Sequence, residues 1–529
     1  MRKTLSVLLV LVLILSLFSA CGNGENSPAP GSSGSTVNTS SAAPQQNSGG
    51  AGGGENVVTI GRNIDASTLD RFKVTEGPSF IYGMMMNDSL ITLKTDGSGS
   101  YSPSLAKSWE VSEDGSAITF KLNTGVKFHN GDILTSADVK YTFERFAKDS
   151  TSRSIFDWTT LKSVETPDAE TAILVFNGPF APALSQVAFT YIVDKKVCEE
   201  LGDKAWEKPV GSGPWKFESW TPGQEIVFTR NDDYWNWGSN KSNVDKVVIK
   251  IISDASTSLA AIQTGLVDVV EPLNVDQVKQ LESYKNVKIE DTLNSGSVYF
   301  YFRTVGIFKD KNVRKAFSLA IDRKSIVETI VGGGKATAWP IDSVSMGYKD
   351  IEPEYDPDQA ADLLKNSSYK GEEFKIIAVT GQVPRITEVL QAVSSMLNQV
   401  GFKSSVEFLD YAAFSDRRIA GNYDVYFASA RTSAGDNGST LITRWLNDQF
   451  KSGYVNEEIN ALIKQQAVEM DIEARNKLFQ QIFQLAYDEV APCTNAYQLN
   501  TISAYKDNIS GIVFKPNSYT DFSRVMKAN

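Results

Sequence analysis

The chain has 529 residues and a formal net charge of −11, with 41% hydrophobic and 22% charged side chains. This acidic balance argues against nucleic-acid binding and gives no basic patch for anionic lipid. His129 is the only histidine, so HExxH and any metal site with two or more His ligands are excluded. A Ser-His-Asp triad would have to use His129, and GxSxG does not occur. We expect His129 to be a turn residue with a structural hydrogen bond.

The first 20 residues are typical of a secretory signal. Arg2 and Lys3 precede an apolar run from Leu5 to Ala20 that only serines interrupt. A membrane span needs about 20 apolar residues, so the run is short for one. Small residues stand directly before Cys21, as in a bacterial lipobox, although Phe18 departs from that pattern. We predict a lipidated Cys21; the alternative is secretion with Cys21 as a free thiol.

Residues 22–56 are predicted to be a flexible linker. They consist almost entirely of Gly, Ser, Asn, Ala, Pro, Thr and Gln, a composition that cannot bury a core. A coil of this length reaches about 30–35 Å. A tether after a lipidated Cys21 would hold a folded head near the outer face of the cell membrane. Its length favours a Gram-positive cell surface.

From Val57 onward no second long apolar run occurs, so this part is expected to be soluble. It is too long for one simple core, and two or three lobes are expected. Besides Cys21 the chain has only Cys198 and Cys493. Two cysteines so far apart give no disulfide framework, and we expect both to be buried thiols; the alternative is that they pair in an oxidising exterior.

The segment from Leu105 to Arg145 predicts strand, turn, strand, turn and helix. Its sequence is LAKSWEVSEDGSAITFKLNTGVKFHNGDILTSADVKYTFER. The first turn, at Glu113-Asp114-Gly115, separates two runs of alternating apolar residues. The helix is expected after Thr135, with Asp138 completing a capping box. Its predicted apolar face carries Val139, Phe143 and Phe146.

Further segments predict α/β structure along the rest of the chain. A helix is expected from Arg385 to Val400, ended by Gly401, and a strand from Lys403 to Leu409. Strands that alternate with helices predict α/β lobes with mixed sheets. Other distinctive stretches read PVGSGPW from Pro209, RNDDYW from Arg230, AAIQTGLVD from Ala260, NVRKAFSLAIDR from Asn312 and YDPDQAADLL from Tyr355.

These stretches, with Leu105–Arg145, resemble in order the family 5 extracellular solute-binding proteins of peptide, dipeptide and nickel ABC importers. The resemblance covers almost all of the chain after Val57. It implies an α/β fold, a two-lobed periplasmic-binding-protein type II clamp with mixed sheets and an extra inserted domain. The implied parts are a signal peptide (1–20), lipidated Cys and linker (21–56), lobe 1 (57–88, 209–293 and 489–529), inserted domain (89–208) and lobe 2 (294–488). The chain crossings near 290–295 and 486–492 would then form a hinge.

The resemblance also implies ligand-binding residues in lobe 2. Asp436, in a stretch similar to GDNGD of the dipeptide receptors, is the candidate partner of a peptide ammonium group; Ser439 replaces the second Asp. The alternative is a turn Asp. Arg385 occupies a place similar to that of a carboxylate-binding arginine, a role that suits the guanidinium fork. The alternative is a solvated Arg. Arg303 stands where the family commonly has Asn, and marks either an acidic ligand or an internal salt bridge.

Tryptophans raise an alternative ligand, since aromatic faces stack on sugars and some members of the family bind oligosaccharides. We expect Trp215 and Trp235, which lie inside motifs, to pack in the core. Trp339 and Trp445 are the better candidates for a cleft. The nickel-binding branch is disfavoured, because lobe 2 has no His.

The sequence thus predicts a lipid-anchored receptor that binds peptides and passes them to the permease of an ABC importer. We expect no catalytic activity, cofactor or metal, and a monomer on the outer face of the cell membrane. One alternative is the same fold with an oligosaccharide or another solute as its ligand. A secreted hydrolase is a further alternative, which the shortage of His disfavours.

Overall fold

The computed structural model describes residues 55–74, 77–94, 100–149, 158–431, 438–439, 441–442, 448–515 and 519–528. Gly54–Asn529 group into one compact unit. Within the described ranges, no helix combines the length and the apolar character that a membrane crossing requires.

The largest sheet among the described residues has 11 strands, in the order β15-β14-β16-β12-β17-β11-β1-β10-β9-β8, with β13 beside β17. Its strands are β1 (Val57–Arg62), β8 (Trp215–Thr221), β9 (Glu225–Arg230), β10 (Lys246–Ile251), β11 (Val269–Leu273), β12 (Val287–Phe302), β13 (Lys335–Ala336), β14 (Glu373–Val379), β15 (Lys403–Leu409), β16 (Val425–Arg431) and β17 (Cys493–Lys506). Parallel pairs such as β1–β10 and antiparallel pairs such as β12–β17 make it a mixed sheet, as expected. The long strands β12 and β17 connect its two halves, and their register shifts between Leu293 and Ser297.

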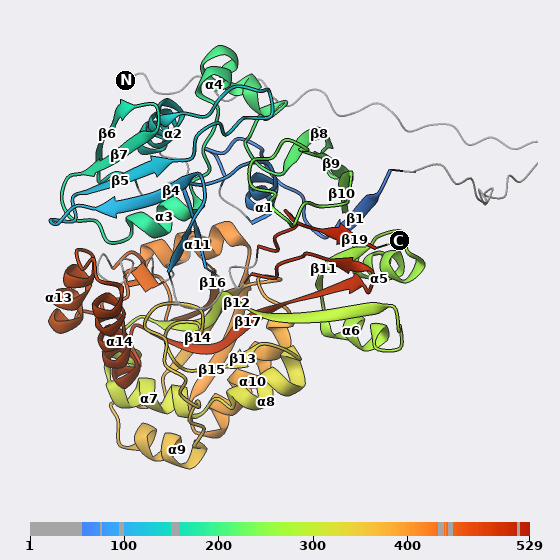
Figure 1. Ribbon diagram of the computed structural model, residues 1–529. Helices are drawn as coiled ribbons and strands as arrows, with labels where there is room; N and C mark the ends of the chain where they lie inside the picture. The colour runs from blue at the N-terminus through green and yellow to red at the C-terminus, as the bar shows by residue number, and fades with distance from the viewer. Residues whose placement is uncertain are drawn as a thin grey trace, which may run out of the picture. The chain divides into compact units, whose positions relative to one another are not determined.

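A separate antiparallel sheet has the order β4-β5-β7-β6. Its strands are β4 (Ala106–Val111), β5 (Ala117–Leu122), β6 (Leu161–Asp168) and β7 (Thr171–Phe176). Two short pairs complete the strands: β2 (Ile91–Leu93) with β3 (Tyr101–Pro103), and β18 (Ile509–Ser510) with β19 (Met526–Lys527). Figure 1 shows β4 to β7 with α2 in the upper part of the view, away from β14 and β15.

Helices cover these sheets. The α-helices are α1 (Gly77–Met86), α2 (Ser136–Lys148), α3 (Ala183–Phe189), α4 (Lys195–Leu201), α5 (Ala255–Thr264), α6 (Val275–Leu281), α7 (Lys311–Leu319), α8 (Arg323–Ser325), α9 (Pro357–Lys365), α10 (Ile386–Gln399), α11 (Tyr411–Ala420), α13 (Glu457–Gln466) and α14 (Ile472–Glu489). Short 3₁₀ segments lie at Gly202–Trp206 and Gly306–Lys309, and a π-helical turn lies at Ile326–Val331. In Figure 1, α7 to α10 surround β14 and β15, and α13 lies beside α14.

The predicted elements of the segment from Leu105 to Arg145 are confirmed. β4 and β5 pair through the turn at Glu113-Asp114-Gly115, and α2 follows Thr135. Thr135 and Asp138 form the capping box. The predicted apolar face is buried, since Val139, Phe143 and Phe146 all belong to a hydrophobic core. Local sequence chemistry was therefore sufficient to predict this segment.

The predicted helix at Arg385 to Val400 and strand at Lys403 to Leu409 are also confirmed, as α10 and β15. The helix that begins at Pro357 has Asp356 as its N-cap, and α5 ends at Gly265 in the left-handed region. Both termini follow the preferences of Pro for the first helical turn and of Gly for the position after the last.

The buried apolar side chains form separate hydrophobic clusters, which take their residues from different parts of the chain. The first cluster takes apolar residues of β1, α1, the antiparallel sheet and β8 to β10, together with residues near the C-terminus. Alternate residues of β12 enter two further clusters: Val298, Phe300 and Phe302 join the second, whereas Tyr299 and Tyr301 join the third. The predicted lobe boundaries and hinge stay predictions.

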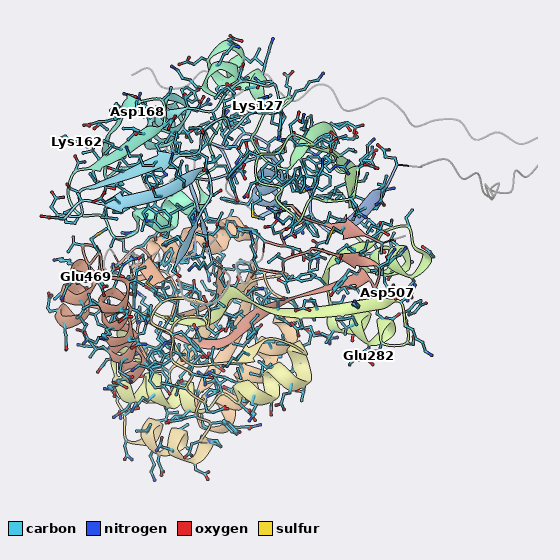
Figure 2. All side chains as sticks on the ribbon, in the orientation of Figure 1. Lys127, Lys162, Asp168, Glu282, Glu469 and Asp507 are labelled. Atoms are coloured by element: carbon cyan, nitrogen blue, oxygen red, sulfur yellow. The ribbon has the colours of Figure 1, made fainter. Side chains whose placement is uncertain are left out.

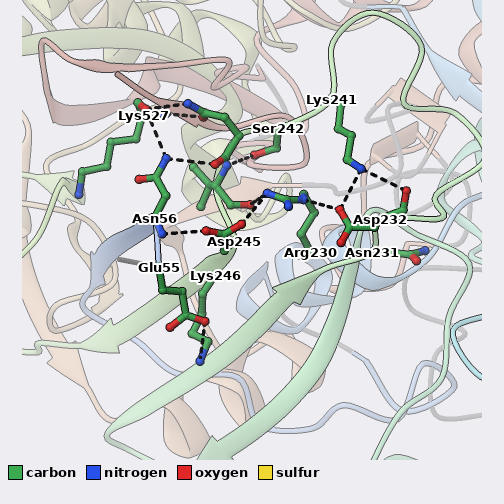
Figure 3. A network of polar contacts seen from close by, with 12 residues as sticks. Glu55, Asn56, Arg230, Asn231, Asp232, Lys241, Ser242, Asp245, Lys246 and Lys527 are labelled. Atoms are coloured by element: carbon green, nitrogen blue, oxygen red, sulfur yellow. Dashed lines mark hydrogen bonds and ion pairs between the residues drawn. The ribbon is translucent and has the colours of Figure 1, made fainter. Parts of the chain in front are cut away.

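The two ends of the folded part are held together beside β10 (Figure 3). The backbone N–H of Asn56 donates to Asp245 Oδ2 at 2.9 Å, and its side chain donates to Asn243 O at 3.1 Å. The backbone N–H of Lys527 donates to Asn243 Oδ1 at 3.1 Å. Asn56, the last residue of the predicted linker, is therefore bound to the folded part.

The labelled charged side chains of Figure 2 lie at the periphery.

Candidate ligand-binding cavity

A cavity of about 610 Å³ lies between residues of the first core cluster and residues that support the third. The residues that line one side come from the segment between α1 and β3, from α3, from the loops next to β8 and β9, and from 515–524. The other side takes them from the loop 343–348 and from the first turn of α14, and Ser295 of β12 lies between the two. The volume falls within the usual range of small-molecule sites, about 300–1,000 Å³.

Asp88 provides a carboxylate in the wall of this cavity. It accepts hydrogen bonds from the Tyr234 hydroxyl at 2.9 Å, from Trp235 Nε1 at 3.0 Å and from the Ser212 hydroxyl at 3.1 Å. Burial raises the pKa of Asp88 to about 6, although these three donors favour the ionised form. The carboxylate is thus ionised at neutral pH and held in one orientation by two of the motifs, PVGSGPW and RNDDYW.

Residues 515–524 add further charges to the same side. Lys515 Nζ lies 2.7 Å from Asp521 Oδ2. Burial alone would raise the pKa of Asp521, but the Lys515 ammonium and the hydrogen bonds from Ser523 outweigh it and hold this pKa at about 2. Arg524 donates to the backbone carbonyls of Trp237 and Asn236. These contacts fix the position of the guanidinium in the cavity wall.

The opposite side combines a loop with a helix end. Asn476 Oδ1 accepts the N–H of Gly347 at 2.7 Å, which joins α14 to the loop 343–348. Arg475 is buried and donates to Gln466 Oε1 at 3.1 Å and to the Ser439 hydroxyl at 2.6 Å. Glu473 is exposed in the cavity lining. The cavity therefore offers hydrogen-bonding groups and charges of both signs, next to apolar surface.

The described residues were also compared with the requirements of metal and thiol chemistry. No group of three or more His, Cys, Asp or Glu suited to a metal ion occurs among them. Both Cys198 and Cys493 are buried free thiols, and burial raises the pKa of Cys198 to about 11. A buried thiol with a raised pKa is a poor nucleophile.

Three residues of the predicted sites, Asp436, Trp445 and Cys21, lie outside the described residues. Arg385 is described, and its Nη2 lies 2.6 Å from Asp276 Oδ2. Arg303 is exposed, and its backbone N–H donates to Asp424 O. Neither arginine is among the described residues that line the cavity. Their roles in ligand binding stay predictions.

The interpretation of His129 as a structural turn residue is confirmed. Its Nδ1 accepts the N–H of Gly211 at 3.2 Å, so its Nε2 carries the proton that it shares with Gly213 O at 3.0 Å. Burial lowers the pKa of His129 to about 4. The neutral ring thereby joins the turn after β5 to the loop before β8.

The prediction that Trp339 faces a cleft is wrong. Its side chain is 0% exposed and belongs to the third cluster, and its Nε1 donates to Gly347 O at 3.1 Å. Trp339 thus supports the cavity loop from behind. The prediction of core packing holds for Trp215, which is fully buried, and Trp235 packs partly buried against the first cluster.

Sequence reasoning missed most residues of the cavity. Asp88, Tyr234 and Arg524 come from separate segments, and each has an ordinary local interpretation as a turn, motif or surface residue. The motifs PVGSGPW and RNDDYW contain the residues that hold Asp88. They were a partial signal of the cavity, although the sequence analysis used them only for the family resemblance.

The chain is a mixed α/β unit, and its cavity lies beside the long strands β12 and β17, which connect the two halves of the large sheet. This is the architecture of a type II periplasmic binding protein. HbpA2 from Haemophilus parasuis has a similar structure, with a TM-score of 0.80 and 24% identity over 90% of this chain and 100% of that one. DppA from Helicobacter pylori, in complex with the peptide STSA, is similar with a TM-score of 0.73 and 25% identity over 90% and 98% of the two chains.

Residues 100–452 match the family of bacterial extracellular solute-binding proteins, family 5, middle part, and the chain belongs to this family. The oligopeptide-binding protein AppA of Bacillus subtilis is 28% identical to it over 97% of this chain and 97% of the relative. The resemblance inferred from six sequence motifs is therefore confirmed.

Proposed function

We propose that this protein is an extracytoplasmic receptor that captures peptides and delivers them to the permease of an ABC importer. The supporting observation is the cavity of about 610 Å³, with fixed hydrogen-bonding groups on both sides, in a family 5 protein. AppA of Bacillus subtilis is an oligopeptide-binding protein, and the similar DppA structure holds a peptide. The receptor acts as a monomer and without catalysis.

Binding proceeds by capture between the lobes and closure about the strands β12 and β17. Such a clamp rotates about a few residues. Main-chain hydrogen bonds to an extended peptide give affinity without regard to its side chains, as in strand addition. Ser295, at the register shift of β12, lines the cavity and suits a position near the axis of this rotation.

Asp436 is proposed as the partner of the peptide ammonium group. A desolvated cation is costly unless a charge pairs with it, so removal of the carboxylate leaves the ammonium uncompensated. We expect Asp436→Ala to weaken binding of a random pool of di- to hexapeptides by about 3–5 kcal/mol in isothermal titration. Asp416→Ala, at an exposed position, is the control and should bind as wild type does.

Wild-type affinity in Asp436→Ala would reduce Asp436 to a turn residue but leave peptide capture intact. Cello- and manno-oligosaccharides form the second arm of the titration. Heat from these sugars, with none from any peptide pool, would overturn the peptide assignment in favour of the oligosaccharide alternative.

We further propose that a lipid on Cys21 anchors the receptor to the outer face of the cell membrane of a Gram-positive bacterium. The proposal is supported by the sequence, in which an apolar run from Leu5 to Ala20 ends in small residues directly before Cys21 and a Gly- and Ser-rich linker follows. Cys21→Ser should release the protein into the medium, as measured by immunoblot of cells and supernatant. If the variant stays on the cells, the anchor is not a lipid on Cys21.

A further inference from the structure

Two large aliphatic side chains remain exposed inside the cavity. Val344 is 40% exposed and Ile472 is 37% exposed, and both line the cavity from the side of the third cluster. Met346 lines the same side. We call these three residues the apolar wall. Water contact with aliphatic surface is unfavourable by roughly 25 cal/mol per Å², so an apolar ligand group that covers this wall gains free energy.

The three residues of the apolar wall belong to one patch, although two chain segments supply them. Ile472 lies four residues before Asn476 in α14, and residues at this spacing share one face of a helix. Asn476 accepts the N–H of Gly347, at the end of the loop that carries Val344 and Met346. The hydrogen bond therefore sets Ile472 beside that loop.

The apolar wall is held in place by its surroundings. The N–H of Ser343 donates to Gln498 Oε1 at 3.1 Å, and Trp339 Nε1 donates to Gly347 O at 3.1 Å. Asn495 Nδ2 in turn donates to Trp339 O at 2.6 Å. Gly347 has a φ of +82°, and a Cβ there would lie 2.7 Å from Phe479. The hydrogen bonds thus tie the loop that carries Val344 and Met346 to β17.

The opposite side of the cavity presents further apolar groups. Phe189 and Ala188 of α3, and Tyr101 of β3, line it. An aliphatic or aromatic group between the two sides would contact apolar atoms on both. Ser343, Ser345 and Glu473 border the apolar wall with polar groups, so the apolar surface is a bounded patch.

We propose that the apolar wall is a specificity site that binds one aliphatic or aromatic side chain of the ligand. This inference rests on the proposed peptide function and adds a preference to it. Peptides with Leu, Ile, Val or Phe bind more tightly than peptides of the same length with Ser, Thr, Asn or Gln. The backbone contacts supply the common part of the affinity, and the apolar wall supplies the difference.

The test uses two random peptide pools of equal length, one rich in Leu, Ile, Val and Phe and one rich in Ser, Thr, Asn and Gln. Isothermal titration of the full folded chain should give at least about tenfold tighter binding of the apolar pool. Val344→Ser and Ile472→Ser should each reduce binding of the apolar pool severalfold, and thereby narrow the difference in affinity between the two pools. Val344 lies in a loop, so its replacement tests the inference even if Ile472→Ser fails to fold.

Val468→Ser is the matched control. Val468 is 49% exposed and precedes α14, but it is not among the described residues that line the cavity. This variant should keep the wild-type preference. Equal affinity for the two pools in wild type, or an unchanged preference in Val344→Ser, overturns the inference while peptide binding stands. Failure of both pools to bind overturns the proposed function itself.

Discussion

His129 shows how one side chain can join two segments of a large domain. Its ring accepts from Gly211 and donates to Gly213, and the first of these hydrogen bonds needs the neutral form, because a protonated Nδ1 cannot accept. Burial lowers its pKa to about 4, whereas an unfolded His titrates near 6.5. The unfolded chain therefore binds this proton first as the pH falls.

We predict that His129 makes the folded state less stable in acid. Its contribution is fully present above pH 6.5 and is lost as the pH falls towards 4, by up to about 3 kcal/mol. His129→Gln keeps a donor and an acceptor but does not titrate. Denaturant unfolding from pH 7.5 to 4 should show the stability of wild type falling relative to that of the variant. A constant difference between the two proteins over this range would contradict the prediction.

Single residues were also where sequence reasoning was least reliable. Trp339 was expected in a cleft because tryptophan faces suit ligands, but the third cluster buries it completely. Residue type states what a side chain can do, whereas its neighbours in space decide what it contacts.

Helices and their ends, by contrast, could be predicted from residues that are close to one another in the sequence. The capping box at Thr135, the N-cap at Asp356 and the glycine end of α5 are all short-range features that the sequence states directly. The apolar period of α10 likewise predicted its buried face. Each depends on residues within a few positions of one another.

The loop from 337 to 350 could not be predicted in this way. Its conformation depends on Asn476, Asn495 and Gln498, which are more than a hundred residues away in the chain. A polar side chain in a strand or helix gives no local sign of its distant partner. The apolar wall was hidden from sequence analysis for this reason.

At the scale of the whole molecule, the family resemblance predicted a mixed α/β clamp, and the chain belongs to that family. The cavity lies where elements of separate cores face each other, beside β12. Closure of such a clamp changes the exposure of its lining, so ligand and conformation are coupled. Capture of a peptide in this cavity is the central claim.

Native mass spectrometry of the folded chain, incubated with a pool of peptides of two to nine residues, tests this claim most directly. We predict one bound peptide per protein, with adduct masses that match members of the pool. Val344→Ser should shift the bound peptides towards polar sequences. A folded protein that retains no peptide of any length, under conditions in which it retains another solute, would contradict the account.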